Sequence, residues 1–175
     1  MERRRTFADE PVRVVPYDQS WPARFDAEKA LLETAIGPLI TGGIHHVGST
    51  AVPGLPAKPV IDILVGVEDL PSSRASFGAL AELGYQYAPY RAEETHWFCK
   101  PSPAHRTHHL HLIPTGSRRY RQELAFRDIL RARADLAERY EELELQLALR
   151  YRDDREAYTE AKLSFINEAL ASGGT

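Results

Sequence analysis

The chain has 175 residues, of which 43% are hydrophobic and 27% are charged, and its formal net charge is −3 at pH 7. This length suits one domain, and the composition favours a filled hydrophobic core over disorder. No apolar run approaches the roughly 20 residues that cross a bilayer, and the acidic balance argues against a dedicated duplex-DNA binder. The single cysteine, Cys99, excludes an intramolecular disulfide and a cysteine-built zinc site, so we expect a cytoplasmic protein.

The first predicted element is a helix that follows a basic start. Residues 1–11 are expected to be a disordered head, because no apolar stretch follows the basic run as it would in a secretory signal, and a single domain is expected over residues 12–172. A helix is predicted from Ser20 to Ile36, with Ser20 as its N-cap and Pro22 in its first turn. Apolar residues recur on one face of this helix, namely Trp21, Phe25, Leu32 and Ile36.

A strand, an ordered loop and a second strand are predicted next. The first strand covers residues 44–47, and the prolines and glycines of residues 48–59 indicate a loop with at most one helical turn. Residues 60–67 form an almost continuous apolar run, which is typical of a central strand buried on both faces. One charged residue, Asp62, interrupts this run.

The rest of the chain is predicted to complete a mixed sheet and then to become helical. A helix is predicted over residues 70–83, and two strands over residues 95–100 and 107–113. Residues 117–171 have the pattern of helices, the last of them capped at residues 153–154. The order of elements indicates an α/β (α+β) fold with a mixed β-sheet, flanking helices and a helical C-terminal part.

Asp62 is the most informative residue of the sequence. An ionised carboxylate in an apolar strand is costly unless it is paired, bound to a metal or placed at the exposed end of the strand. One interpretation is a salt bridge to a nearby arginine or lysine. The other is a catalytic or ligand-binding carboxylate at the mouth of a sheet, which the turn before it favours.

That turn combines a glycine with two hydroxyl side chains and is followed by a lysine. Gly48 allows a sharp turn and a close approach to a ligand, while Ser49 and Thr50 offer hydroxyl and N–H groups to an anion. Lys58, in the following loop, suits a phosphate as a mobile positive charge. The alternative is that Lys58 is a loop lysine whose side chain is simply exposed to solvent.

The segment around this turn resembles the signature of the GrpB family. Residues 45–65 carry it as HHVGSTAVPGLPAKPVIDILV. The likeness spans about residues 12–170. It includes Tyr17-Asp18, Trp21-Pro22, Gly84-Tyr85, His108-His109-Leu110-His111, Phe126-Arg127-Asp128, Tyr140, and the closing Tyr158, Lys162 and Phe165-Ile166.

The resemblance implies the polymerase-β-like nucleotidyltransferase fold. In that superfamily a Gly-Ser turn is followed by two carboxylates that alternate on one strand, and these hold metal ions that clamp nucleotide phosphates. Asp62 matches the first carboxylate. The second position is Leu64, which does not bind metals, so the sequence departs from the pattern of two-metal nucleotidyl transfer.

Histidines in a later strand are candidates for the missing ligands. Because side chains alternate along a strand, His109 and His111 face one way and His108 the other. If this strand lies beside that of Asp62, then Asp62, His109 and His111 form a candidate site for a divalent metal such as Zn²⁺ or Mn²⁺; Mg²⁺ prefers oxygen ligands. The two histidines equally suit hydrogen bonds to phosphate or a structural role.

Two further residues complete the predicted phosphate site. His46 lies beside the Gly48-Ser49 turn and is expected in the same pocket. Arg106 precedes the histidine strand and can present a planar fork to phosphate, although an arginine in a loop is more often solvated.

Three functions fit these residues. The first is nucleotidyl or phosphoryl transfer with a metal, and the second is a non-catalytic module that binds a nucleotide or a coenzyme A-related ligand. The family resemblance implies the latter ligand, since a similar module is joined to dephospho-coenzyme A kinase in some bacteria. The third is a single-metal hydrolase. The expected partner is a nucleotide or other phosphorylated small molecule.

Overall fold

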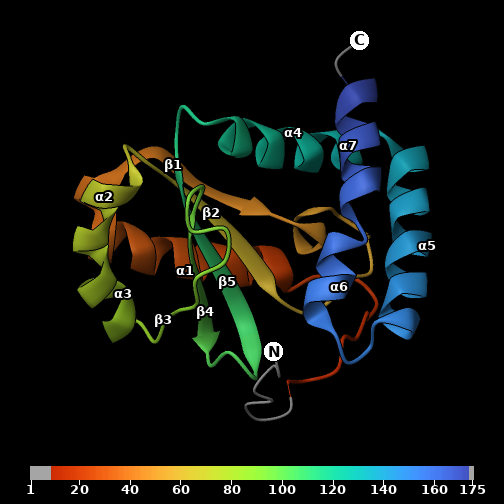
Figure 1. Cartoon of the computed structure of the whole chain (residues 1–175), viewed down its shortest axis with the longest axis horizontal. Helices are drawn as coiled ribbons and strands as arrows, with labels where there is room; N and C mark the ends of the chain where they lie inside the picture. The colour runs from red at the N-terminus through yellow and green to blue at the C-terminus, as the bar shows by residue number, and fades with distance from the viewer. Residues whose placement is uncertain (1–8, 174–175) are drawn as a thin grey trace.

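The computed structural model describes residues 9–173 and confirms the mixed sheet with flanking helices (Figure 1). One five-stranded sheet has the strand order β1-β2-β5-β4-β3. Strands β2 and β5 pair in parallel, and the other neighbours are antiparallel. The strands are β1 (Ile40–Val47), β2 (Ile61–Val67), β3 (Gln86–Tyr87), β4 (His96–Pro101) and β5 (Arg106–Pro114).

Helix α1, Trp21–Ile36, covers one face of the sheet. The four apolar residues predicted for its buried face all belong to the main core, together with Ile61, Ile63 and Val65 of β2. Its N-terminus differs from the prediction, because the Ser20 side chain caps nothing. Instead Asp18 accepts hydrogen bonds from the N–H groups of Ser20, at 2.8 Å, and of Trp21, at 3.1 Å, through its carboxylate and carbonyl oxygens respectively.

The predicted helix over residues 70–83 is divided into three pieces. They are α2 (Leu70–Ser73), a 3-10 turn (Arg74–Ser76) and α3 (Phe77–Glu82). The hydroxyl groups of Ser73 and Ser76 donate to carbonyl oxygens three residues earlier, at 2.8 Å and 2.7 Å. Serine side chains that bond locally in this way compete with the helical ladder.

The strands are close to their predicted places, with two differences. Strand β1 begins at Ile40 rather than at residue 44, and its register with β2 is irregular between Ile40 and Ile44. The short strand β3 was not predicted, and it pairs with β4 through Gln86 and Tyr87.

The C-terminal part consists of four helices, in agreement with the helical pattern predicted over residues 117–171. They are α4 (Arg118–Ala132), α5 (Ala134–Arg150), α6 (Arg155–Glu160) and α7 (Leu163–Ser172). Residues 153–154 provide the predicted cap, since the Asp154 carboxylate accepts the N–H of Ala157 at 3.0 Å, but the capped helix is α6 and not the last helix, α7. Helix α4 covers the second face of the sheet, and α5 and α7 stand beside it at one end (Figure 1). Within residues 9–173 no helix is both long and apolar enough to cross a membrane.

The predicted disordered head falls mainly on residues 1–8, which lie outside the described residues. Residues that follow it are held in place, contrary to the expectation for residues 9–11. The N–H of Glu10 donates to the carbonyl of Ala104 at 3.2 Å, and Asp9 lies 3.6 Å from the Arg155 guanidinium.

Candidate functional site

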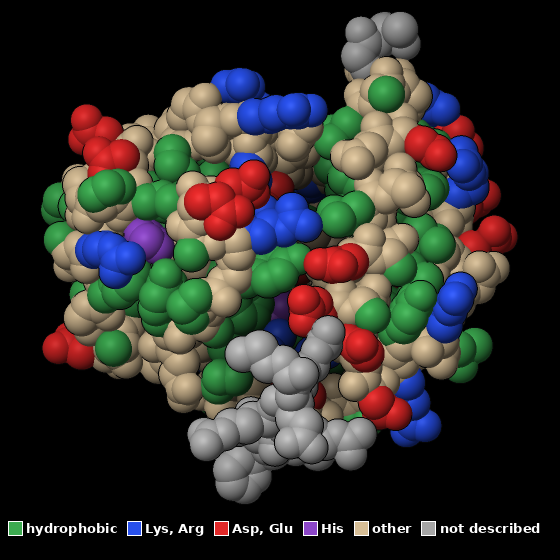
Figure 2. Space-filling view, in the orientation of Figure 1, with side chains coloured by type: hydrophobic (Ala, Val, Ile, Leu, Met, Phe, Trp, Pro, Cys, Tyr) green, Lys and Arg blue, Asp and Glu red, His purple; other side chains and the backbone are tan. Residues whose placement is uncertain are grey.

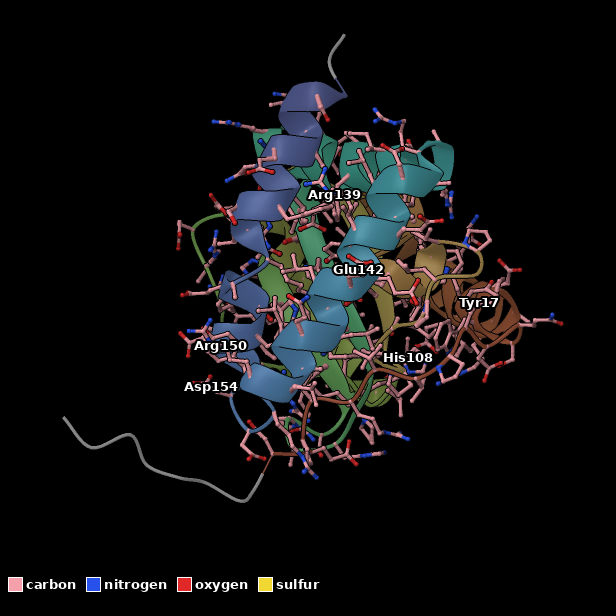
Figure 3. The ribbon with its side chains drawn as sticks, turned by 90° about the vertical axis from the view of Figure 1, so that its right-hand side faces the viewer. Tyr17, His108, Arg139, Glu142, Arg150 and Asp154 are labelled. Carbon is pink, nitrogen blue, oxygen red and sulfur yellow. The ribbon has the colours of Figure 1, made fainter. Side chains whose placement is uncertain are left out.

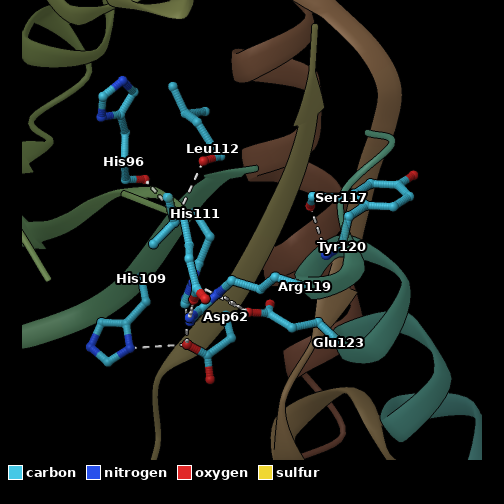
Figure 4. Close-up of polar contacts among 11 residues, drawn as sticks. Asp62, His96, His109, His111, Leu112, Ser117, Arg119, Tyr120 and Glu123 are labelled. Atoms are coloured by element: carbon cyan, nitrogen blue, oxygen red, sulfur yellow. Dashed lines mark hydrogen bonds and ion pairs between the residues drawn. The ribbon is translucent and has the colours of Figure 1, made fainter. Parts of the chain in front are cut away.

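The parallel pairing of β2 with β5 places Asp62 directly opposite His109. His109 and His111 lie on the same face of the sheet as Asp62, toward α4 (Figure 4). His108 faces α1 instead, with its Nε2 atom 3.8 Å from the carboxylate of Glu28. The expectation that the histidine strand adjoins the Asp62 strand, with these orientations, is therefore confirmed.

Asp62 and His109 form a close hydrogen-bonded pair. The distance between His109 Nδ1 and Asp62 Oδ1 is 2.9 Å, and His111 Nε2 lies 3.8 Å from the same oxygen. Burial acts to raise the pKa of Asp62, but the hydrogen bond from His109 and the nearby ring of His111 outweigh it and hold that pKa well below its usual range. An ionised carboxylate only accepts hydrogen bonds, so His109 Nδ1 carries the proton of this contact.

His109 is therefore a neutral imidazole with a free lone pair. Burial lowers the pKa of His109 to about 4, although the hydrogen bond and charge of Asp62 act to raise it. Its other nitrogen, Nε2, is buried and has no hydrogen-bond partner among the described residues. The ring packs beside Trp97 of β4, with the two centroids 4.8 Å apart. Asp62 thus orients a histidine whose acceptor nitrogen is available to a ligand.

Gly48 is required at its position by both conformation and space. Its φ is +73°, a left-handed conformation that side chains rarely adopt. A Cβ atom there would lie 2.5 Å from Asp62 Oδ2. The glycine therefore allows the turn after β1 to pass against the carboxylate.

The two hydroxyl groups of the turn have protein partners. Ser49 donates to Glu144 Oε1 of α5 at 2.7 Å. Thr50 is buried, donates to the carbonyl of Val60 at 3.2 Å and contacts His46 Nε2 at 2.9 Å. The side chain of Thr50 therefore fastens the turn to the start of β2, and its predicted contact with a phosphate stays a prediction.

His46 does not share the pocket of Asp62 as expected. It lies on the opposite face of β1, where its ring stacks on Phe25 of α1 with centroids 4.8 Å apart. Burial lowers the pKa of His46 to about 4. The alternation of side chains along β1 explains this placement, because Val47, not His46, shares the α4 side with Leu64.

Lys58 faces a small cavity of about 60 Å³. Arg106, His109 and Arg155 also line this cavity. The ammonium of Lys58 lies 4.9 Å from the centre of the Tyr158 ring, and no carboxylate or other hydrogen-bond acceptor binds it within residues 9–173. Burial lowers the pKa of Lys58 to about 8. Nearby, the molecular surface is hollowed between the sheet and helices α6 and α7, with acidic side chains along the margin (Figure 2).

Arg106 and Arg155 approach the cavity from separate segments and are held by neighbouring carbonyls. Arg106 donates to the carbonyl of Pro103 at 2.7 Å and lies over the ring of Trp97 at 5.0 Å. Arg155 donates to the carbonyls of Pro103 and Ala104, at 2.9 Å and 3.0 Å. An arginine keeps its charge in a protein, and the contact with Pro103 fixes the side chain, so Arg106 is a positioned cation rather than a solvated loop residue.

Leu64, which stands where the two-carboxylate pattern has its second carboxylate, has apolar surroundings. It is fully buried in an apolar cluster with Val47 and Ile113, and Tyr120 and Leu124 of α4 pack against this cluster. Helix α4 therefore covers the position where the second carboxylate would stand, and no ion has access to it.

The candidate metal residues are adjacent but do not surround a common point. Asp62 and His109 point at each other across 2.9 Å. Among residues 9–173 no set of three histidine, cysteine, aspartate or glutamate side chains is arranged to hold a metal ion. The observed geometry does not fit the metal centre, and a metal bound by Asp62, His109 and His111 stays a prediction.

Three charged residues of the site come from the C-terminal part of the chain and were not predicted as site residues: Glu144, Arg155 and Lys162. Lys162 lies 3.5 Å from Glu144 Oε1 and 4.5 Å from the centre of the Tyr158 ring. A signal for Glu144 was present, because its spacing from Tyr140 and Leu147 puts a charge on the buried face of α5. Arg155 had no comparable signal.

The chain matches a protein family over almost its whole length. The model of the family described as "GrpB protein" matches residues 11–172. The chain belongs to the GrpB family. A crystal structure of the conserved protein GrpB from Enterococcus faecalis is similar at a TM-score of 0.82 with 30% identity, covering 92% of this chain and 96% of that one.

Two curated proteins extend the comparison. A UPF0157 protein of Pseudomonas aeruginosa is 43% identical to this GrpB-family chain over 167 residues, which is 93% of the chain and 67% of that protein. A dephospho-CoA kinase of Mycolicibacterium paratuberculosis is also 43% identical, but only over 84 residues, which is 46% of the chain and 20% of the kinase.

Proposed function

We propose that this GrpB-family protein binds a phosphorylated small molecule of the nucleotide class in the cleft beside β2 and β5. The observation that carries the proposal is Lys58, a half-buried ammonium without a counter-ion among the described residues. It lines one cavity with two arginines and His109. Burying a cation without a partner is costly, and a phosphate supplies both the negative charge and the acceptor oxygens.

The residues of the cavity have different roles in binding the ligand. Lys58, Arg106 and Arg155 donate hydrogen bonds and neutralise the phosphate. His109 presents an acceptor at Nε2, which suits a hydroxyl group or a protonated phosphate oxygen. Asp62 acts through His109 as a positioning residue, since it fixes the tautomer and the orientation of the ring.

Binding is favoured over metal-dependent nucleotidyl transfer by the position of Leu64. The second carboxylate of that mechanism is replaced by a buried apolar side chain beneath α4. The partial likeness to a dephospho-CoA kinase supports including coenzyme A-related compounds among the ligands to be tested.

Replacing Lys58 with methionine is expected to weaken phosphate binding by more than about tenfold, because a charge-assisted hydrogen bond is lost. The measurement is ligand-induced thermal stabilisation and calorimetry with pyrophosphate, AMP, ATP and dephospho-coenzyme A. Lys29→Met is the matched control, because Lys29 lies on the exposed surface of α1 with 42% of its side chain accessible.

Each compound is tested with and without Mn²⁺ or Zn²⁺, and the metal content of the purified protein is measured in parallel. The proposal is abandoned if no phosphorylated compound stabilises the wild-type protein under any of these conditions. Equal weakening in Lys58→Met and Lys29→Met would show that general charge, rather than this cavity, attracts the ligand.

A further inference from the structure

Glu144 of α5 is a buried carboxylate with one satisfied and one unsatisfied oxygen. Its side chain is 2% exposed, and its Oε1 atom accepts the hydroxyl of Ser49 at 2.7 Å and lies 3.5 Å from Lys162 Nζ. The Oε2 atom has no hydrogen-bond partner among residues 9–173. Buried polar atoms of native proteins nearly always have partners, so this oxygen has room in its hydrogen bonding for a further donor.

Glu144 is linked to the cavity of the proposed phosphate site by a chain of contacts, although neither Glu144 nor Tyr158 lines that cavity. The Tyr158 ring connects the two, because Lys58 lies 4.9 Å and Lys162 lies 4.5 Å from its centre. The hydroxyl of Tyr158 is also buried and has no partner in the described part of the chain. The two unsatisfied side-chain atoms therefore belong to residues that contact the lysines of the site, Tyr158 beside Lys58 and Lys162, and Glu144 beside Lys162.

The chemistry of Glu144 restricts what can bind there. A carboxylate accepts hydrogen bonds and repels anions, so the group at Oε2 must be a donor and not an ionised phosphate oxygen. Hydroxyl and amino groups are such donors. The tyrosine hydroxyl can either donate or accept, so it suits the same groups.

On the basis of the proposed phosphate site, we infer that the ligand carries a hydroxyl or amino group close to its phosphate and that this group donates a hydrogen bond to Glu144 Oε2. This chemistry is that of sugar phosphates and of the ribose in nucleotides. Simple alkyl phosphates and inorganic phosphate lack it. Glu144 is thus a specificity-determining residue, and the cations of the cavity provide the common affinity for phosphate.

Two phosphate esters on the same carbon skeleton test the inference in the wild-type protein. Glycerol 3-phosphate has two free hydroxyl groups, and n-propyl phosphate has none. We expect calorimetry to show about tenfold tighter binding of glycerol 3-phosphate, which is typical of one added hydrogen bond to a charged group. Ribose 5-phosphate is expected to bind at least as tightly as glycerol 3-phosphate.

The variant Glu144→Gln keeps the shape of the side chain but places an amide where the carboxylate was. It is expected to abolish the preference for glycerol 3-phosphate, so that the two esters bind the variant with affinities within about twofold of each other. Glu142→Gln is the matched control, because Glu142 is exposed on the same helix (Figure 3). The control is expected to retain the full preference.

The outcomes separate the two proposals. If both esters bind wild-type protein equally, the donor subsite is overturned, a buried water fills the place at Oε2, and the phosphate site stands. If neither ester, inorganic phosphate nor ribose 5-phosphate binds, the phosphate site itself fails and the inference falls with it. The wild-type comparison needs no variant, so it remains decisive even if Glu144→Gln does not fold.

Discussion

Replacing Gly48 with alanine is expected to lower the free energy of unfolding by about 3 kcal/mol, and to weaken binding of any phosphate ligand in the same variant. Two costs combine at this position. The backbone has a φ of +73°, and the new Cβ atom would lie 2.5 Å from Asp62 Oδ2. Relief of the clash requires Asp62 to move, which disturbs the hydrogen bond that orients His109.

Two other glycines separate these costs. Gly54 has a φ of +81° but open space around its Cβ position, so Gly54→Ala measures the backbone cost alone, about 1 kcal/mol. Gly78 lies in α3 with open space and without a positive φ, so Gly78→Ala is expected to stabilise the fold by up to about 1 kcal/mol. The measurement is urea unfolding of all three variants. If Gly48→Ala costs no more than Gly54→Ala, the close approach of Gly48 to Asp62 is refuted.

The fold is expected to lose stability steeply as the pH falls from about 6.5 to about 4. Burial lowers the pKa values of His46, His108 and His109 to about 4. Within this range the unfolded chain protonates these histidines and the native chain does not, so unfolding takes up protons and acid favours it. With three such groups the free energy of unfolding changes by up to about 4 kcal/mol per pH unit.

Asp62 contributes little to this slope. Its native pKa lies below its usual range, so its stabilising effect is present above the unfolded pKa and is lost only as the pH falls below about 4. Urea unfolding at several pH values between 7 and 5 measures the slope. Replacing His46 by glutamine is expected to reduce it by about 1.4 kcal/mol per pH unit, the contribution of one proton. A free energy of unfolding that stays constant between pH 7 and pH 5 would contradict the burial of these three histidines.

The features that follow from local patterns were predictable from the sequence. The spacing of apolar residues defined α1, and side-chain alternation placed His109 and His111 together on one face. That β5 lies beside β2 was an assumption, and the structure confirms it; the parallel direction of the pairing was not predicted. Asp62 was recognised because a charge within a buried strand requires a compensating partner.

The features that depend on how helices dock were not predictable. Glu144 and Arg155 reach the site only because α5 and α6 lie against the end of the sheet, and no local pattern specifies that arrangement. The breaks between α2 and α3 depend on serine side chains that bond to the backbone, which periodicity does not detect. His46 was misplaced for a simpler reason, since its neighbour Val47 shares the site face of β1.

The hydrogen bond between Ser49 and Glu144 joins residues that are 95 positions apart in the chain. Closing so long a loop costs chain entropy before any contact repays it, so this contact is expected to form late in folding. A ligand that bridges Lys58 and Glu144 would then hold the C-terminal helices against the sheet. Amide hydrogen exchange in α5–α7 should slow when it binds, even for residues that do not touch it.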